Sequence, residues 1–156
     1  MSTVSLFTDG SVNVQSKIGY GAYLMLSDLS GAEPSQEDVR VKRFVETSST
    51  KLELQTLLWA LAETSHPGDT VRIYTDSQNI IGLPRRRERF ETNNYFSKKG
   101  RKLNNYELYQ AFYRVTDELN FELIKVQGHL PSDEMNAIDR IFTLVDNGSR
   151  DAQRAD

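Results

Sequence analysis

The stretch VSLFTDGS, residues 4–11, decides how the rest of this sequence is interpreted. Its apolar side chains alternate along residues 4–9 and predict a strand of a packed sheet, yet this strand ends on Asp9. An ionised carboxylate at the end of a buried strand is unfavourable unless a partner compensates its charge. Asp9 is therefore either a turn residue before Gly10 or a ligand for a cation.

The composition is typical of a globular protein, because 38% of the residues are hydrophobic and 26% are charged. A chain of 156 residues predicts a single domain, 1–156, large enough to bury a core. The absence of cysteine excludes disulfides and cysteine–zinc sites. No signal peptide or apolar membrane-spanning run is evident, so we expect a cytoplasmic protein without membrane partners. No oligomerisation motif is evident either, and a monomer is expected.

The periodicity of apolar residues changes along the chain. A period of two predicts strands at 4–9, 19–27, 39–46, 70–75 and 121–126. A helical period predicts helices at 50–64, 77–83 and 105–118, and a long final helix. Ser49 or Thr50 is the expected N-cap of the first helix, Pro84 the end of the second, and Asp133 the cap of the last. The first three strands can form a meander, whereas the later strand–helix–strand units require parallel neighbours, so the pattern predicts a mixed α/β sheet.

Four acidic residues stand where structure alone would not place them. Each has an ordinary explanation: Asp9 as a turn residue, Asp76 as an N-cap, Glu53 in a capping box, and Asp146 on the solvated flank of the last helix. Together they favour another interpretation. Asp9 and Asp76 both follow strands, and ligands of open α/β sheets bind beyond the carboxyl ends of parallel strands. Glu53 faces inward from the first helix and can reach the same edge.

Converging carboxylates repel one another unless a divalent cation neutralises them. A ligand set made only of oxygen atoms suits Mg²⁺ or Mn²⁺. The sequence therefore predicts a metal site at this edge of the sheet.

Four motifs, in order along the chain, resemble the ribonuclease H family of type 1: FTDGS, LELQTLLWAL, YTDSQ and VQGH before the last helix. The resemblance covers nearly the whole chain. It implies a five-stranded sheet in the order 3-2-1-4-5 with helices on both faces. It also implies metal-dependent cleavage of the RNA strand in RNA–DNA hybrids, leaving 5′-phosphate and 3′-hydroxyl ends.

By the same resemblance, Asp9, Glu53 and Asp76 match the family's first three metal-binding carboxylates. His129 matches a loop histidine that assists proton transfer or product release. The expected cofactor is a pair of Mg²⁺ ions, with Mn²⁺ as a substitute. Asp9 would bridge the two ions, Glu53 and Asp76 would hold one, and the fourth carboxylate would hold the other.

The fourth carboxylate departs from the family pattern. The segment after His129 lacks the usual Asn-Glu-x-Ala-Asp-like run and offers Asp139 and Asp146, which lie two turns apart on one helix. Asp139 is nearer to His129. We predict Asp146, because Val145 precedes it and Arg150 follows one turn later.

Recognition of the substrate is expected from residues near these motifs. Gly10, Ser11, Asn13, Ser49, Thr50 and Gln78 can reach the minor groove of a hybrid, where the 2′-hydroxyl distinguishes RNA from DNA. A basic segment, residues 85–102, stands out in a chain of net charge −3. It falls where some family members carry a basic protrusion, and we predict phosphate contacts from Arg85, Arg86, Arg87, Lys98 and Lys99.

Two other functions fit the same sequence. A related metal nuclease would also cut double-stranded RNA. A non-catalytic module of the same fold would bind hybrids without cutting them, but it would not need the first three carboxylates. Comparing Mg²⁺-dependent cleavage of hybrid, double-stranded RNA and DNA separates these possibilities.

Overall fold

The computed structural model describes residues 3–27, 33–127, 130, 131, 133 and 135–156. Five strands form one sheet in the order β3-β2-β1-β4-β5. The strands are β1 (Thr3–Asn13), β2 (Ile18–Leu26), β3 (Arg40–Phe44), β4 (Thr70–Thr75) and β5 (Asn120–Lys125). The helices are η1 (Gln36–Asp38), α1 (Ser49–Thr64), α2 (Gln78–Ile81), α3 (Leu83–Thr92), α4 (Tyr106–Thr116) and α5 (Ala137–Ala155). None of the helices in these residues is long and apolar enough to cross a membrane.

The sheet is mixed, as the sequence predicts. β2 pairs antiparallel with β1 and with β3, which makes the meander. β4 pairs parallel with β1 and with β5, which places the carboxyl ends of these three strands at one edge. The strand order 3-2-1-4-5 is thereby confirmed.

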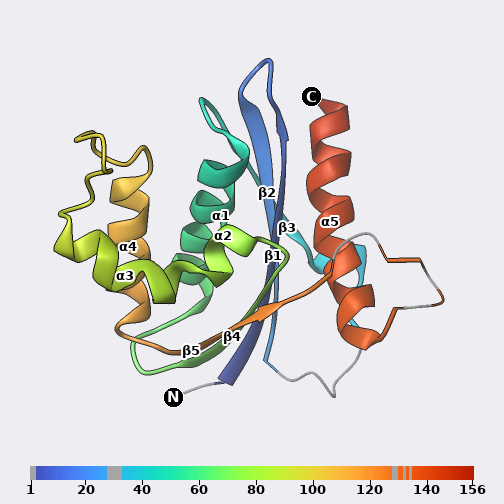
Figure 1. The fold of residues 1–156 in the computed structure, drawn as a ribbon. Helices are drawn as coiled ribbons and strands as arrows, with labels where there is room; N and C mark the ends of the chain where they lie inside the picture. Colours follow the sequence, from blue (N-terminus) through green and yellow to red (C-terminus); the bar gives the residue numbers. More distant parts are fainter. Residues whose placement is uncertain (1–2, 28–32, 128–129, 132, 134) are drawn as a thin grey trace.

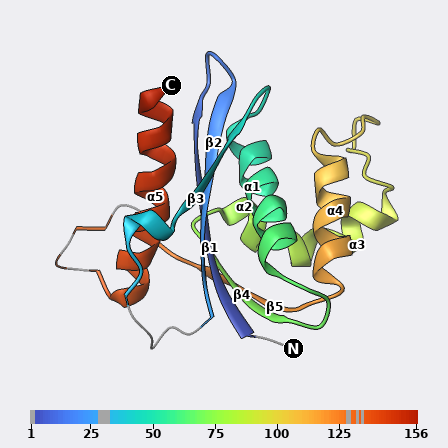
Figure 2. The same cartoon turned by 180° about the vertical axis from the view of Figure 1, so that it is seen from behind.

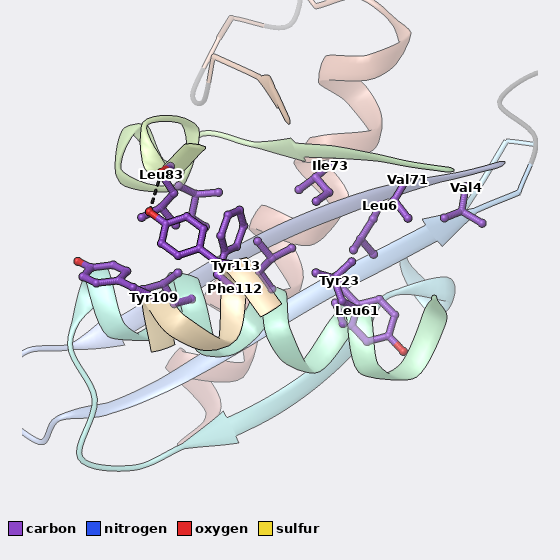
Figure 3. Packing of buried hydrophobic residues seen from close by; sticks show 14 of the residues in the cluster. Val4, Leu6, Tyr23, Leu61, Val71, Ile73, Leu83, Tyr109, Phe112 and Tyr113 are labelled. Carbon is purple, nitrogen blue, oxygen red and sulfur yellow. Dashed lines mark hydrogen bonds between the residues drawn. The ribbon is translucent and has the colours of Figure 1, made fainter. Parts of the chain in front are cut away.

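Helices cover both faces of the sheet. Figures 1 and 2 show α5 on one face, with the short η1 beside it, and α1 to α4 on the other. Each face has its own apolar cluster, and side chains of β1 alternate between them: Leu6 packs toward α1, and Phe7 packs toward α5. Figure 3 shows the larger cluster, where the Tyr113 hydroxyl donates a hydrogen bond of 2.6 Å to the backbone carbonyl of Leu83.

An aromatic pair fixes the register of the two strands that carry Asp9 and Asp76. Phe7 and Tyr74 are direct partners in the parallel β1–β4 ladder, and their rings stack with centroids 4.4 Å apart. Asp9 and Asp76 each lie two residues further on, just past the end of this ladder. Because side chains alternate with a period of two, Asp9 points to the same face as Phe7, which is the face covered by α5.

Several predicted boundaries were wrong. The N-cap of α1 is Ser48, whose hydroxyl accepts a hydrogen bond from the Lys51 amide, rather than Ser49 or Thr50. Pro84 does not end a helix but lies in the first turn of α3, where a residue without an N–H group is tolerated. Asn136, not Asp133, caps α5. β1 continues beyond Asp9, because the hairpin with β2 extends its pairing to Asn13.

The contact between Gly21 of β2 and Thr56 of α1 determines how closely α1 packs against the sheet. A Cβ atom built on Gly21 of β2 would lie 2.1 Å from Oγ1 of Thr56, which is fully buried on α1. We expect Gly21→Ala to destabilise the protein by about 1–3 kcal/mol, because the side chains cannot separate without moving the helix. Urea denaturation would measure this loss. Adding Thr56→Ala to Gly21→Ala should restore part of the lost free energy of unfolding, because it removes the side chain that clashes. If the effects of the two substitutions simply add, the residues are not in contact.

Candidate active site

An open pocket of about 380 Å³ lies at the edge where the parallel strands end. Residues from three parts of the fold line it: β1, the first turns of α1, and the segment after β4 together with the start of α2. The lining residues are Asp9, Gly10, Val12, Ser49, Leu52, Glu53, Asp76, Ser77, Gln78 and Asn79. The structure thus brings together the first three carboxylates that the sequence singles out.

Asp9 occupies the centre of the acidic cluster. Burial raises the pKa of the Asp9 carboxyl group to about 8, and the negative charges of Asp76 and Asp146 add to this shift. A hydrogen bond from the Gly10 backbone opposes it. The carboxyl groups of Asp9 and Asp146 are also within hydrogen-bonding reach of each other. Asp9 therefore interacts with a carboxylate on either side.

Glu53 and Asp76 complete the cluster toward α1. Burial raises the pKa of Glu53, a hydrogen bond with Ser77 opposes this shift, and the charge of Asp76 adds to it. Neither residue serves as a helix cap. Ser48 caps α1, and the N-cap of α2 is Ser77, whose hydroxyl accepts a hydrogen bond of 3.2 Å from the Ile80 amide. The capping explanations for Glu53 and Asp76 are therefore wrong.

Asp139 and Asp146 have different surroundings on α5. Asp139 closes a capping box, because its carboxylate accepts from the Asn136 amide while its own amide donates to the Asn136 side chain. Asp146 lies two turns later, beside Asp9, and forms an ion pair of 3.0 Å with Arg150. The local contacts of Asp139 account for its position, whereas Asp146 joins the acidic cluster.

The donor set of this cluster fits a hard divalent cation. Its members contribute only carboxylate oxygens, and Asp9 has an abnormally high pKa that a nearby cation would relieve. Among the described residues, however, no group of three or more histidine, cysteine, aspartate or glutamate side chains is close enough, as placed, to hold one metal ion. The four carboxylates instead interact in series, Glu53 with Asp76, Asp76 with Asp9, and Asp9 with Asp146, and we call this series the carboxylate arc.

Comparison with known proteins identifies the family. The family model described as RNase H matches residues 1–143, which is most of the chain. The chain belongs to the ribonuclease H family. Ribonuclease H of Moorella thermoacetica is 28% identical over 148 residues, covering 90% of both chains. Ribonuclease H of Acetivibrio thermocellus is 26% identical over 150 residues, covering 92% of this chain and 94% of its own.

A solved structure agrees with this fold. LC9-RNase H1, described as a type 1 RNase H with the type 2 active-site motif, superposes with a TM-score of 0.73. The match covers 99% of this chain and 73% of that protein, with 17% identity. The family match ends at residue 143, so Asp139 lies inside it and Asp146 beyond it. Asp146 is therefore favoured by its position beside Asp9 and not by the family match.

The residues predicted to contact the substrate lie in several different parts of the structure. Gly10, Ser49 and Gln78 line the pocket with the carboxylates. Ser11 lies further along the β1–β2 hairpin, and the Asn13 side chain accepts hydrogen bonds from the turn amides of residues 15 and 16. Thr50 lines a second hollow, between α1 and α3. His129 lies outside the described residues.

The basic segment consists of α3 followed by a loop with an isolated bridge between Phe96 and Lys102. Arg86 donates to the backbone carbonyls of Asn79 and Gly82 and so ties α3 to α2. Arg87 forms ion pairs with Asp117 and Glu91. Two of the five predicted phosphate-binding residues are therefore engaged within the protein.

The other three predicted phosphate-binding residues are exposed: Arg85, Lys98 and Lys99. Two hollows of about 510 and 460 Å³ adjoin α3, and Arg89 and Phe90 line both. Arg86 lines the first of these hollows and Lys98 the second. Phosphate contacts from Arg87 would have to compete with its two carboxylate partners, so the exposed cations are the better candidates.

Three residues of the site escaped sequence reasoning. Ser77 hydrogen-bonds to Glu53 and could have been recognised as the cap of α2. Asn79 lines the pocket, and its buried side-chain nitrogen has no hydrogen-bond partner among the described residues. Lys125 ends β5 and donates to Gln78, a contact 47 residues apart in sequence that no local pattern signals.

Proposed function

We propose that this chain is a metal-dependent endonuclease that hydrolyses the RNA strand of RNA–DNA hybrids and leaves 5′-phosphate and 3′-hydroxyl ends. The observation that carries the proposal is that Asp9, in the pocket at the edge where the parallel strands end, interacts with both Asp76 and Asp146. Membership of the ribonuclease H family supports the substrate class. The names of the relatives support the same activity.

The arc of carboxylates supports a site for two divalent cations. Asp9, at its centre, would be shared, Glu53 and Asp76 would hold one ion, and Asp146 would hold the other. We propose Mg²⁺ as the natural ion, with Mn²⁺ as a substitute, because all the donors are carboxylate oxygens. When bound, such ions activate water and stabilise the developing charge on the scissile phosphate.

The protein itself supplies position and charge. Ser77 orients the Glu53 carboxylate through a hydrogen bond, and Arg150 holds the Asp146 carboxylate at 3.0 Å. Gly10, Ser49 and Gln78 line the same pocket, which supports the proposal that they contact the ribose and phosphate groups of the RNA strand. His129 remains the predicted assistant for proton transfer or product release.

Cleavage of a panel of duplexes tests the proposal. Labelled RNA–DNA hybrid, double-stranded RNA and double-stranded DNA of one sequence would be incubated with the protein, with Mg²⁺ or with EDTA. We expect cleavage of the hybrid's RNA strand with Mg²⁺ and none with EDTA. Mass spectrometry of the fragments should show 5′-phosphate ends. Equal cleavage of double-stranded RNA would indicate the broader nuclease, and binding without cleavage would indicate the non-catalytic module.

The exposed cations of the basic segment should govern the salt dependence of binding. Replacing Arg85, Lys98 and Lys99 together with glutamine should reduce the slope of log affinity against log salt by about 0.7–0.9 for each phosphate that the variant no longer neutralises. Arg87→Gln should change this slope less, because its guanidinium is held by Asp117 and Glu91. Fluorescence anisotropy with labelled hybrid in EDTA, across a salt series, would measure both. An unchanged slope in the triple variant would argue against phosphate contacts from this segment.

A further inference from the structure

Lys125 approaches the candidate active site from the end of β5. Its Cα pairs with that of Thr75, the residue before Asp76. Side chains of β5 alternate between faces, and Lys125 continues the row of Phe121 and Leu123 on the face covered by α1 to α4. Its ammonium group donates a hydrogen bond of 2.7 Å to Oε1 of Gln78, the first residue of α2.

This contact determines which end of the Gln78 side chain faces the pocket. A carboxamide has an acceptor oxygen at one end and a donor NH₂ group at the other. An ammonium group can only donate, so the end that faces Lys125 must be the oxygen. The NH₂ group is then the end that does not contact Lys125, and Gln78 lines the pocket together with Asp76. A donor at this place can recognise the acceptor oxygens of a ribose or a phosphate, and a rotated amide would present an acceptor instead.

We propose that Lys125 is a positioning residue that fixes the Gln78 carboxamide with its NH₂ group toward the substrate. This inference rests on the proposed function for the class of substrate, and it adds a residue and a contact that the carboxylate site does not include. Lys125 acts through Gln78. Its removal should therefore have no further effect once Gln78 is absent.

A double-mutant cycle tests this dependence. Affinity for the hybrid, and for double-stranded DNA of the same sequence, would be measured in EDTA by fluorescence anisotropy. Lys125→Met, which keeps the apolar stem but cannot donate, should weaken hybrid binding about three- to tenfold, the range expected for one hydrogen bond. It should reduce the preference for hybrid over DNA. Lys125→Arg should restore most of the loss, because its guanidinium can donate to the same oxygen. In the Gln78→Ala background, Lys125→Met should change affinity less than about twofold.

A matched control separates this role from a general loss of charge. Arg72 lies on the neighbouring strand β4, nearer its start than its end, and is exposed beside Glu122 at 3.9 Å. Arg72→Met removes one positive charge, as Lys125→Met does, and should leave the affinity for hybrid within about twofold. Equal losses in these two variants would overturn the proposal. An undiminished effect of Lys125→Met in the Gln78→Ala background would also overturn it, because Lys125 would then contact the substrate itself.

The orientation of the amide can be followed without nucleic acid. The Gln78 side-chain NH₂ resonances in a ¹⁵N-labelled protein would be assigned by their loss in Gln78→Ala. They should shift in Lys125→Met and stay in place in Arg72→Met. Unchanged resonances in Lys125→Met would overturn the inference. A wild-type protein that neither binds nor cuts the hybrid would overturn the proposed function instead, and the two failures are therefore distinguishable.

Discussion

Asp9→Asn and Asp76→Asn are each expected to lower the rate of hybrid cleavage by at least about 10³-fold, equivalent to several kcal/mol of transition-state stabilisation by metal ions. Asp9 stands between two other carboxylates, and Asp76 stands between Asp9 and Glu53. An amide in either place removes a negative donor from the arc while keeping nearly the same shape. Single-turnover cleavage of labelled hybrid at saturating Mg²⁺ would measure the loss.

Controls for these variants use folding and binding. Circular dichroism should show the same secondary structure, and the affinity for hybrid in EDTA should not fall, because the carboxylate that is removed repels phosphate.

The single-turnover cleavage assay also decides between the two acidic residues of α5. Asp146→Asn should lose most of its cleavage rate, whereas Asp139→Asn should lose stability through its capping box and keep its cleavage rate. Retained cleavage in a folded Asp9→Asn or Asp76→Asn variant would remove the metal mechanism.

The second large effect concerns stability without metal. The pKa of Asp9 is about 8 in the folded protein, against about 3.9 for an unfolded aspartate. Between these pH values the folded state binds a proton that the unfolded state has released. The free energy of unfolding therefore falls as pH rises from about 4 to about 8. Asparagine does not ionise, so Asp9→Asn should be more stable than wild type at pH 8 by several kcal/mol, and this advantage should vanish near pH 4.

Urea denaturation in EDTA at several pH values would measure this difference. Mg²⁺ should stabilise the wild type at pH 8, because it binds the folded state, and should stabilise Asp9→Asn much less. Asp151→Asn provides the control, because Asp151 lies on the same helix as Asp146 in an exposed pair with Arg154. A gain in Asp9→Asn that does not depend on pH would show that ionisation of the buried Asp9 carboxyl group is not its cause.

The sequence predicts the architecture well because the architecture depends on periodicity. Alternation along β1 and β4, and the helical spacing of α1, are local patterns that burial enforces over many residues. The same patterns place Asp9 and Asp76 at the ends of two strands. The strand order 3-2-1-4-5, which the resemblance to the ribonuclease H family implies, makes these strands neighbours and so predicts that the two carboxylates meet. The position of Glu53 near these carboxylates can also be predicted, because Glu53 lies on the face of α1 that packs against the sheet.

The details that sequence reasoning missed depend on contacts between distant segments. The local sequence around Pro84 is compatible with the end of one helix and equally with the start of another. The hydrogen bond from Arg86 to the backbone carbonyl of Gly82 is seen only in the structure. Asn136 caps α5, and Asp139 hydrogen-bonds with it in a capping box. Asp146 is therefore favoured over Asp139 as a member of the acidic cluster. Lys125 reaches Gln78, which lines the pocket, only because β5 pairs with β4, and the sequence around Gln78 does not indicate this contact.

The stacked rings of Phe7 and Tyr74 have a consequence for how this protein acquires its activity. If β4 slipped by one residue against β1, the side chain of Asp76 would emerge on the opposite face of the sheet. The alignment of the acidic groups thus depends on the register of β4 against β1, in which Phe7 and Tyr74 are direct partners with stacked rings. Refolding from urea should consequently recover cleavage and native fluorescence with a single time course, since a molecule that has docked these strands correctly has already built its reactive centre.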